Sequence, residues 1–143
     1  MNQGRILAVD LGEKRIGLAV SDPSRTIASP VRVVSHTSGA EDAAKILQVS
    51  SEMEITLIIV GVPIGDDGQD SPQTRHSTKF AELLKGHTQL KVILWDESNS
   101  TNRAQEIRQK MGVSRKNRTG HLDDLAAAVI LQSFLDAGAP VPE

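Results

Sequence analysis

Hydrophobic residues at the start of the chain fall into short runs that are typical of β-strands. Residues 5–10 and 15–21 are apolar runs on either side of a short polar turn that contains Gly12, a pattern that predicts a β-hairpin. Residues 27–35 predict a third strand. Because Pro30 has no N–H to give to a ladder, this third strand is expected at a sheet edge. The start of the chain therefore predicts a three-stranded antiparallel meander.

Helical patterns and buried strands alternate along the rest of the chain. Two nearly unbroken apolar runs are typical of parallel strands buried on both faces, residues 55–60 and 90–95. Four helices are predicted by apolar periodicity and capping residues, over residues 38–53, 73–85, 98–111 and 122–135. Gly86 and Gly112 are expected to end two of them. Loops are expected over residues 61–72 and 113–120.

These elements predict an α/β fold with a five-stranded mixed sheet flanked by helices. Placing the Pro30 strand at the edge favours the strand order 3-2-1-4-5, which leaves the strand of residues 5–10 in the centre. Asp10 and Glu97 then come at the carboxyl ends of parallel strands, where open α/β sheets bind ligands.

Composition limits the chemistry. A chain of 143 residues with 38% hydrophobic and 24% charged residues suits one soluble domain, residues 1–143, and no stretch approaches membrane-spanning length. We expect a cytoplasmic protein, monomeric or homodimeric. The absence of cysteine excludes disulfides, thiolate zinc sites and cysteine nucleophiles, so a metal would need oxygen or imidazole ligands. With two Phe, one Trp and no Tyr, an aromatic platform for single-stranded nucleic acid is not expected.

Three acidic positions stand out: Asp10, Glu97 and one of Asp123 and Asp124. Taken singly, such acids have ordinary explanations, since Glu97 can cap a helix and the acidic pair can complement a helix dipole. Taken together over one sheet edge, bare carboxylates would repel, and Mg²⁺ or Mn²⁺ would remove that conflict. Two such ions could clamp a phosphodiester during hydrolysis. Helical spacing does not choose between Asp123 and Asp124.

Basic residues are concentrated in one segment although the formal net charge is −2. Six cations stand against the single acid Glu106 in this segment: Arg103, Arg108, Lys110, Arg115, Lys116 and Arg118. With Lys14 and Arg15 of the first turn, they suit contacts to a nucleic-acid backbone. The alternative is a solvated helix face, in which Glu106 and Lys110 form an ordinary i,i+4 pair.

Residues 9–22, Val-Asp-Leu-Gly-Glu-Lys-Arg-Ile-Gly-Leu-Ala-Val-Ser-Asp, resemble the first motif of the bacterial YqgF/RuvX proteins, Holliday-junction-resolvase-like members of the ribonuclease H superfamily. Later motifs are similar and occur in the right order: Val60-Gly-Val-Pro63 with Gly68, Trp95-Asp-Glu97 with Ser100-Thr101, and Asp123-x-x-Ala-Ala127 with Ile130-Leu-Gln132. The resemblance implies a ribonuclease-H-like fold and a catalytic, metal-binding site of Asp10, Glu97 and Asp123. It selects Asp123 over Asp124.

One position departs from the family pattern. The family often has arginine directly after the site glutamate, whereas Ser98 stands there in this chain. If that arginine orients the acid or binds a phosphate, another cation must replace it here, and Arg103 and Arg15 are the candidates.

The patterns and the resemblance together imply a Mg²⁺- or Mn²⁺-dependent endonuclease. The resemblance further implies that it processes the 5′ end of precursor 16S ribosomal RNA. One alternative is a Holliday junction resolvase that cuts four-way DNA with the same residues. A second is a non-catalytic RNA-binding assembly factor, whose affinity would survive the loss of Asp10. A phosphotransferase related to actin or sugar kinases is disfavoured, because one domain of 143 residues leaves no second lobe to clamp a nucleotide.

Overall fold

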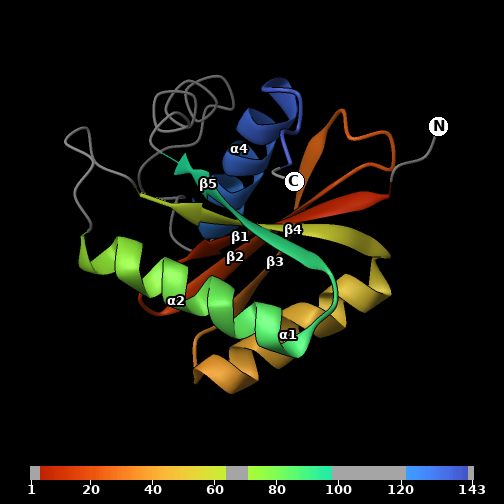
Figure 1. The fold of residues 1–143 in the computed structure, drawn as a ribbon. Coiled ribbons are helices and arrows are strands. Elements are labelled where there is room, and N and C mark those ends of the chain that lie inside the picture. The colour runs from red at the N-terminus through yellow and green to blue at the C-terminus, as the bar shows by residue number, and fades with distance from the viewer. Residues whose placement is uncertain (1–3, 64–70, 98–121, 142–143) are drawn as a thin grey trace.

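A computed structural model describes residues 4–63, 71–97 and 122–141 of the chain. Its five strands are β1 (Arg5–Leu11), β2 (Arg15–Ser21), β3 (Ala28–Ser35), β4 (Ile55–Val62) and β5 (Lys91–Asp96). Its helices are α1 (Gly39–Glu52), α2 (Pro72–His87) and α4 (Leu122–Asp136). The strands form one sheet in the order β3-β2-β1-β4-β5, which confirms the predicted fold class and strand order (Figure 1).

The sheet is antiparallel on one side of β1 and parallel on the other. β1 pairs with β2 antiparallel and with β4 parallel, and β4 pairs with β5 parallel. β3 is the edge strand, as Pro30 predicted, and Pro30 lies where the β2–β3 register shifts between Leu18 and Ala19. The carboxyl ends of β1, β4 and β5 therefore lie side by side at one edge of the sheet, here called the carboxyl edge.

Helices cover both faces of this sheet. Figure 1 shows α1 and α2 against one face and α4 against the other. Alternate residues of β1 divide between the two sides: Leu7 and Val9 belong to the α1/α2 core, whereas Ile6 and Ala8 pack with α4. By the same alternation Asp10 belongs to the α4 face.

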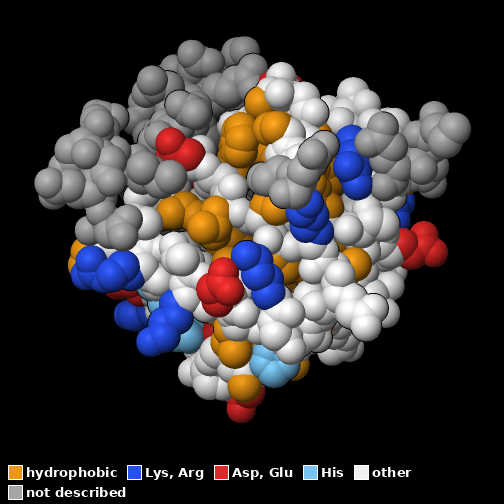
Figure 2. Space-filling view, viewed as in Figure 1, with side chains coloured by type: hydrophobic (Ala, Val, Ile, Leu, Met, Phe, Trp, Pro, Cys, Tyr) orange, Lys and Arg blue, Asp and Glu red, His pale blue; other side chains and the backbone are white. Residues whose placement is uncertain are grey.

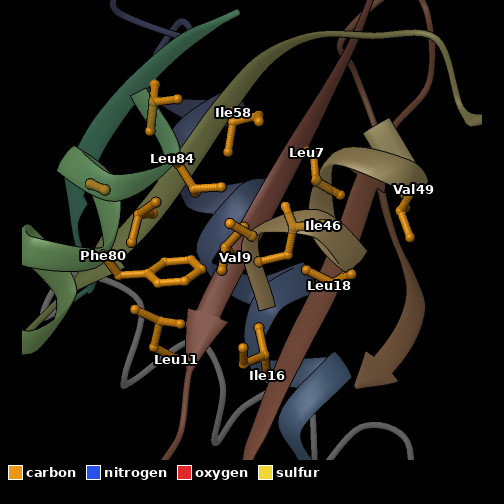
Figure 3. Packing of buried hydrophobic residues seen from close by; sticks show 14 of the residues in the cluster. Leu7, Val9, Leu11, Ile16, Leu18, Ile46, Val49, Ile58, Phe80 and Leu84 are labelled. Atoms are coloured by element: carbon orange, nitrogen blue, oxygen red, sulfur yellow. The ribbon is translucent and has the colours of Figure 1, made fainter. Parts of the chain in front are cut away.

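The core on the α1/α2 side is built from branched aliphatic residues of the central strands. Figure 3 shows Leu7, Val9 and Leu18 directed toward Ile46 of α1 and Leu84 of α2, all of which are fully buried. The N-terminus of α1 is capped as predicted, because the Ser38 hydroxyl accepts a hydrogen bond of 3.2 Å from the Glu41 N–H. This core holds β1 and β4 rigidly from one side.

Helix α4 packs on the opposite face, as its apolar sequence predicted. Phe134 is fully buried and meets Trp95 edge to face, with ring centroids 5.1 Å apart. The Trp95 indole N–H donates to the Ser133 hydroxyl over 3.1 Å. At the far side of the sheet, the Gln132 side chain accepts from Ala28 N at 2.9 Å. α4 is thus tied to β5 and β3, on both sides of the central strands.

Two element boundaries differ from the sequence prediction. β4 runs on through Gly61 to Val62, which the local pattern assigned to a loop, because these residues pair with Trp95 and Asp96 of β5. α2 continues through Gly86 to His87, since one glycine costs a helix only about 1 kcal/mol and the helix is held by its packed face. The predicted helix 98–111 and loop 113–120 lie outside the described residues. No described helix has both the length and the apolarity to cross a membrane.

Candidate active site

Asp10 lies at the carboxyl edge, as the next-to-last residue of β1, and its side chain is partly exposed. The strand turns back directly after it: Gly12 N–H donates to Arg15 C=O over 2.8 Å. A Cβ on Gly12 would lie only 2.7 Å from that carbonyl oxygen, so this turn requires glycine. The backbone that carries Asp10 is therefore fixed by a tight hairpin on one side and by the ladder to β4 on the other.

Glu97 follows the last residue of β5, and its side chain is half-buried. The Glu97 Oε2 atom lies 2.8 Å from the point where a Cβ on Gly61 would stand, and Ile130 Cδ1 of α4 lies 2.9 Å from the same point. Because β4 lies between β5 and β1, the Glu97 carboxylate extends inward over β4, toward the strand that carries Asp10. Because Ile130 of α4 approaches the same point above Gly61, that carboxylate lies on the α4 face, the face of Asp10.

The surroundings of Glu97 disfavour its negative charge. Burial raises the pKa of the Glu97 carboxyl above its ordinary value, and the neighbouring charge of Asp96 raises it further. A bound cation would oppose both effects and favour the carboxylate. Mg²⁺ and Mn²⁺ prefer oxygen ligands. The carboxylates of Asp10 and Glu97 therefore fit the predicted ion type.

The structure describes two of the three predicted site acids. It places Asp10 and Glu97 on one face at one edge, with only β4 between their strands. Position 123 belongs to the first turn of α4, but the side chains of Asp123 and Asp124 lie outside the described part. No group of three Asp, Glu, His or Cys side chains suited to a metal occurs among the residues that the structure describes. The three-acid convergence stays a prediction.

The predicted basic residues divide in the same way. Lys14 in the β1–β2 turn and Arg15 at the start of β2 are exposed, a few residues after Asp10. The six cations of the segment 103–118, together with Ser98, lie outside the described residues. The sequence reading missed Gly61 as the neighbour of the Glu97 carboxylate. The exposed Arg75 and Lys79 of α2 were not predicted either, because two basic residues on a helix are no signal of a functional site.

Comparison with known protein families and with relatives points to one family. A family model described as "RuvX: Holliday junction resolvase" matches residues 4–137. A relative in Thermoanaerobacter pseudethanolicus is 40% identical over 134 residues, 93% of this chain and 96% of its own. One in Anaeromyxobacter dehalogenans is 41% identical over 136 residues, 95% of this chain and 99% of its own. Both bear the name "Putative pre-16S rRNA nuclease".

Solved structures of junction resolvases share the fold. Thermus thermophilus RuvC in complex with a Holliday junction has a TM-score of 0.60 and 16% identity, covering 97% of this chain and 99% of that one. The fowlpox virus resolvase with junction DNA has a TM-score of 0.56 and 14% identity, covering 95% and 99%. The fold is that of the RuvC-like, ribonuclease-H-type nucleases, enzymes that hydrolyse phosphodiester bonds. Within this class, the chain belongs to the RuvX family, which confirms the resemblance seen in its motifs.

The raised pKa of Glu97 generates a prediction for the metal-free protein. A carboxyl whose pKa is higher in the folded state than in the unfolded state destabilises the fold at pH values above both, where it must be ionised. We expect Glu97→Gln to raise the free energy of unfolding at pH 7 in a chelating buffer. The gain should shrink as the pH falls through the raised pKa of Glu97 and should vanish below the ordinary glutamate pKa. Urea unfolding at a series of pH values measures it.

The matched control is Glu82→Gln on the surface of α2, where the glutamate pairs with Lys85 in solvent. This change should leave the unfolding free energy within about 0.5 kcal/mol at every pH. A Glu97→Gln protein that is less stable than wild type at pH 7 would show that the glutamate is held by favourable partners, contrary to this account.

Proposed function

We propose that the chain is a divalent-metal-dependent endonuclease that trims the precursor of 16S ribosomal RNA at its 5′ end. The names of its relatives and its family membership support the substrate class. The observation that carries the catalytic part is the Glu97 carboxylate lying over Gly61, one strand away from Asp10. Acids from two strands share one face there, and one of them carries a charge that its surroundings disfavour.

In this proposal Asp10, Glu97 and Asp123 hold Mg²⁺ or Mn²⁺. Position 123 is supported by helix periodicity, since it is seven residues before Ile130, the α4 residue at Gly61, and residues seven apart share a helix face. The same periodicity sets position 124 about 100° around the helix axis from position 123. A divalent ion at these carboxylates supplies charge neutralisation, polarisation of the phosphoryl oxygens and activation of water.

The residues of the chain fix where the reaction takes place. The hairpin at Gly12 and the paired strands hold the backbone of Asp10 in place, which favours a metal ligand that is positioned before substrate arrives. Burial of Ile130 and its neighbours closes the α4 side of the site. Hydrolysis adds water across one P–O ester bond of the backbone, leaving a phosphate on one product and a hydroxyl on the other.

Basic side chains next to the site would bind the phosphates that flank the cleaved bond. The start of α2 lies beside the end of β1, because the Gln73 amide donates to Leu11 C=O over 2.9 Å. Figure 2 shows Lys and Arg side chains gathered where α2 begins. The first turn of α2 contains no acid, although a helix N-terminus favours one. Arg75 and Lys79 of α2 are both exposed. With Lys14 and Arg15, they suit an external polyanion.

A junction resolvase is the second candidate, because the family model bears that description and two structures with this fold hold junction DNA. The same acids would serve both reactions. Purified protein with Mg²⁺ or Mn²⁺, given a precursor rRNA fragment and a four-way DNA junction, separates the two. The proposal expects cleavage of the RNA at a defined 5′ position, mapped by sequencing the product ends. Cleavage of the junction alone would favour the resolvase.

Replacing Asp10 tests the metal-dependent chemistry. Asp10→Asn keeps the size of the side chain but removes the charge that would hold the ion. We expect cleavage to fall by more than about 100-fold, because even the outer partners of metal ligands cost 10–100-fold when they are lost. Substrate binding measured by filter retention should persist. Cleavage at the wild-type rate would overturn the proposed site, and an inactive wild type that still binds RNA would favour the assembly factor.

The role of Lys14 and Arg15 in RNA binding can be measured in the Asp10→Asn protein, which is expected not to cleave the RNA. Lys14→Glu with Arg15→Glu should weaken RNA binding and reduce the salt dependence of the binding constant by about one unit of slope for each lost phosphate contact. Lys85→Glu is the control, because that lysine pairs with Glu82 near the far end of α2. Equal effects of the two charge reversals would show that Lys14 and Arg15 have no particular place in binding.

A further inference from the structure

Gly61 stands at the centre of the proposed site although its backbone does not require glycine. It is a paired residue of β4, opposite Trp95 of β5. Among the described glycines, only Gly4 and Gly138 have the positive φ that favours this residue. Inside a strand, glycine adds backbone freedom and no packing surface, and it often marks a place where another group approaches closely. The available space, rather than the conformation, is therefore what glycine provides here.

The space above Gly61 is occupied by two side-chain ends. A Cβ at this position would lie 2.8 Å from Glu97 Oε2 and 2.9 Å from Ile130 Cδ1, closer than Cβ atoms in proteins come to other atoms. Neither atom belongs to the backbone. An added methyl group would therefore be accommodated by moving one or both side chains, and the strand itself could stay in place.

We propose that Gly61 is a positioning residue, whose missing side chain leaves the space over β4 in which the Glu97 carboxylate reaches toward Asp10. This inference rests on the proposed function, in which Glu97 holds the metal ion. Any larger residue at position 61 pushes the carboxylate away from the strand that carries Asp10. The glycine of the Val60-Gly-Val-Pro63 motif thereby acts through Glu97.

Glu97 is the side chain that yields more easily. Ile130 is 3% exposed and belongs to the α4-side core, where close packing resists displacement. Glu97 is only half-buried and directly follows the edge strand β5. A methyl group on residue 61 is thus expected to displace the carboxylate further than the isoleucine.

The test compares Gly61→Ala with Gly86→Ala, a matched change in α2 whose added Cβ meets no atom within 4 Å apart from its chain neighbours and its own helix backbone. Both proteins should keep the far-ultraviolet circular dichroism of the wild type. Gly61→Ala should bind Mn²⁺ at least about 10-fold more weakly by calorimetry and cleave RNA at least about 10-fold more slowly, the scale of a misplaced metal ligand. Gly86→Ala should match the wild type in both. Wild-type Mn²⁺ affinity and cleavage in Gly61→Ala would overturn the inference.

A second variant separates positioning from packing. Ile130→Val removes the Cδ1 atom, so the double variant Gly61→Ala/Ile130→Val relieves the apolar contact and leaves the contact with Glu97. It should regain any thermal stability that Gly61→Ala loses, but not Mn²⁺ affinity. Recovery of both would show that Gly61 serves the core only and would overturn the inference. If Gly61→Ala alone does not fold, the double variant carries the test.

Glu97→Gln distinguishes failure of this inference from failure of the proposed function. A Glu97→Gln protein that binds Mn²⁺ and cleaves as the wild type does would overturn both, because Glu97 would then have no role to support. If Glu97→Gln is inactive while Gly61→Ala is fully active, only the role of Gly61 falls.

Discussion

The parallel pairing of β4 between β1 and β5 is the constraint on which the proposed site depends. It brings the carboxyl ends of three strands to one edge, so that Asp10 and Glu97, far apart in sequence, come to lie on the same face. The pairing is stabilised by residues that are buried on both sides of the sheet, among them Val9 and Ile59, which are fully buried. Shifting β4 by one residue would turn Gly61 to the other face and place a side chain where the Glu97 carboxylate now lies.

The two faces of the sheet differ in what they bury. The α1/α2 side holds a core of branched aliphatic residues that packs against the strands, as Figure 3 shows. The α4 side combines an apolar core with the acids at the carboxyl edge, where the raised pKa of Glu97 reflects a local electrostatic conflict. Such a conflict is common at active sites, where groups are arranged for the reaction at some expense of stability. The hydrogen bonds of Gln132 and Trp95, which join α4 to β3 and β5, help the fold to tolerate this conflict.

Local sequence patterns predicted the fold because the strand and turn residues of this chain are distinctive. Pro30 identified the edge strand, and the hairpin around Gly12 set the antiparallel half of the sheet, so the strand order followed. Asp10 and Glu97 could be selected because each stands at the carboxyl end of an apolar run. Whether three acids converge could not be settled in this way, since helix spacing left Asp123 and Asp124 equivalent and the resemblance alone chose between them.

The prediction failed where a residue's role is defined by its neighbours in space. Gly61 looks like the start of a loop when only its sequence neighbours are considered, yet lateral pairing with Trp95 keeps it in β4. The half-burial of Glu97 depends on that same glycine and on Ile130, which come from two other elements. The hydrophobic periodicity of a single strand or helix does not show which residues of other elements will lie next to it, so this contact could not be predicted.

Anomalous diffraction from crystals of the wild-type protein grown with Mn²⁺ tests the central claim most directly. The account predicts a manganese peak at the carboxyl edge, with carboxylate oxygens of both Asp10 and Glu97 within about 2.0–2.4 Å of it, as expected for a small divalent ion. Manganese held elsewhere, or by neither acid, at a concentration that supports cleavage would contradict it.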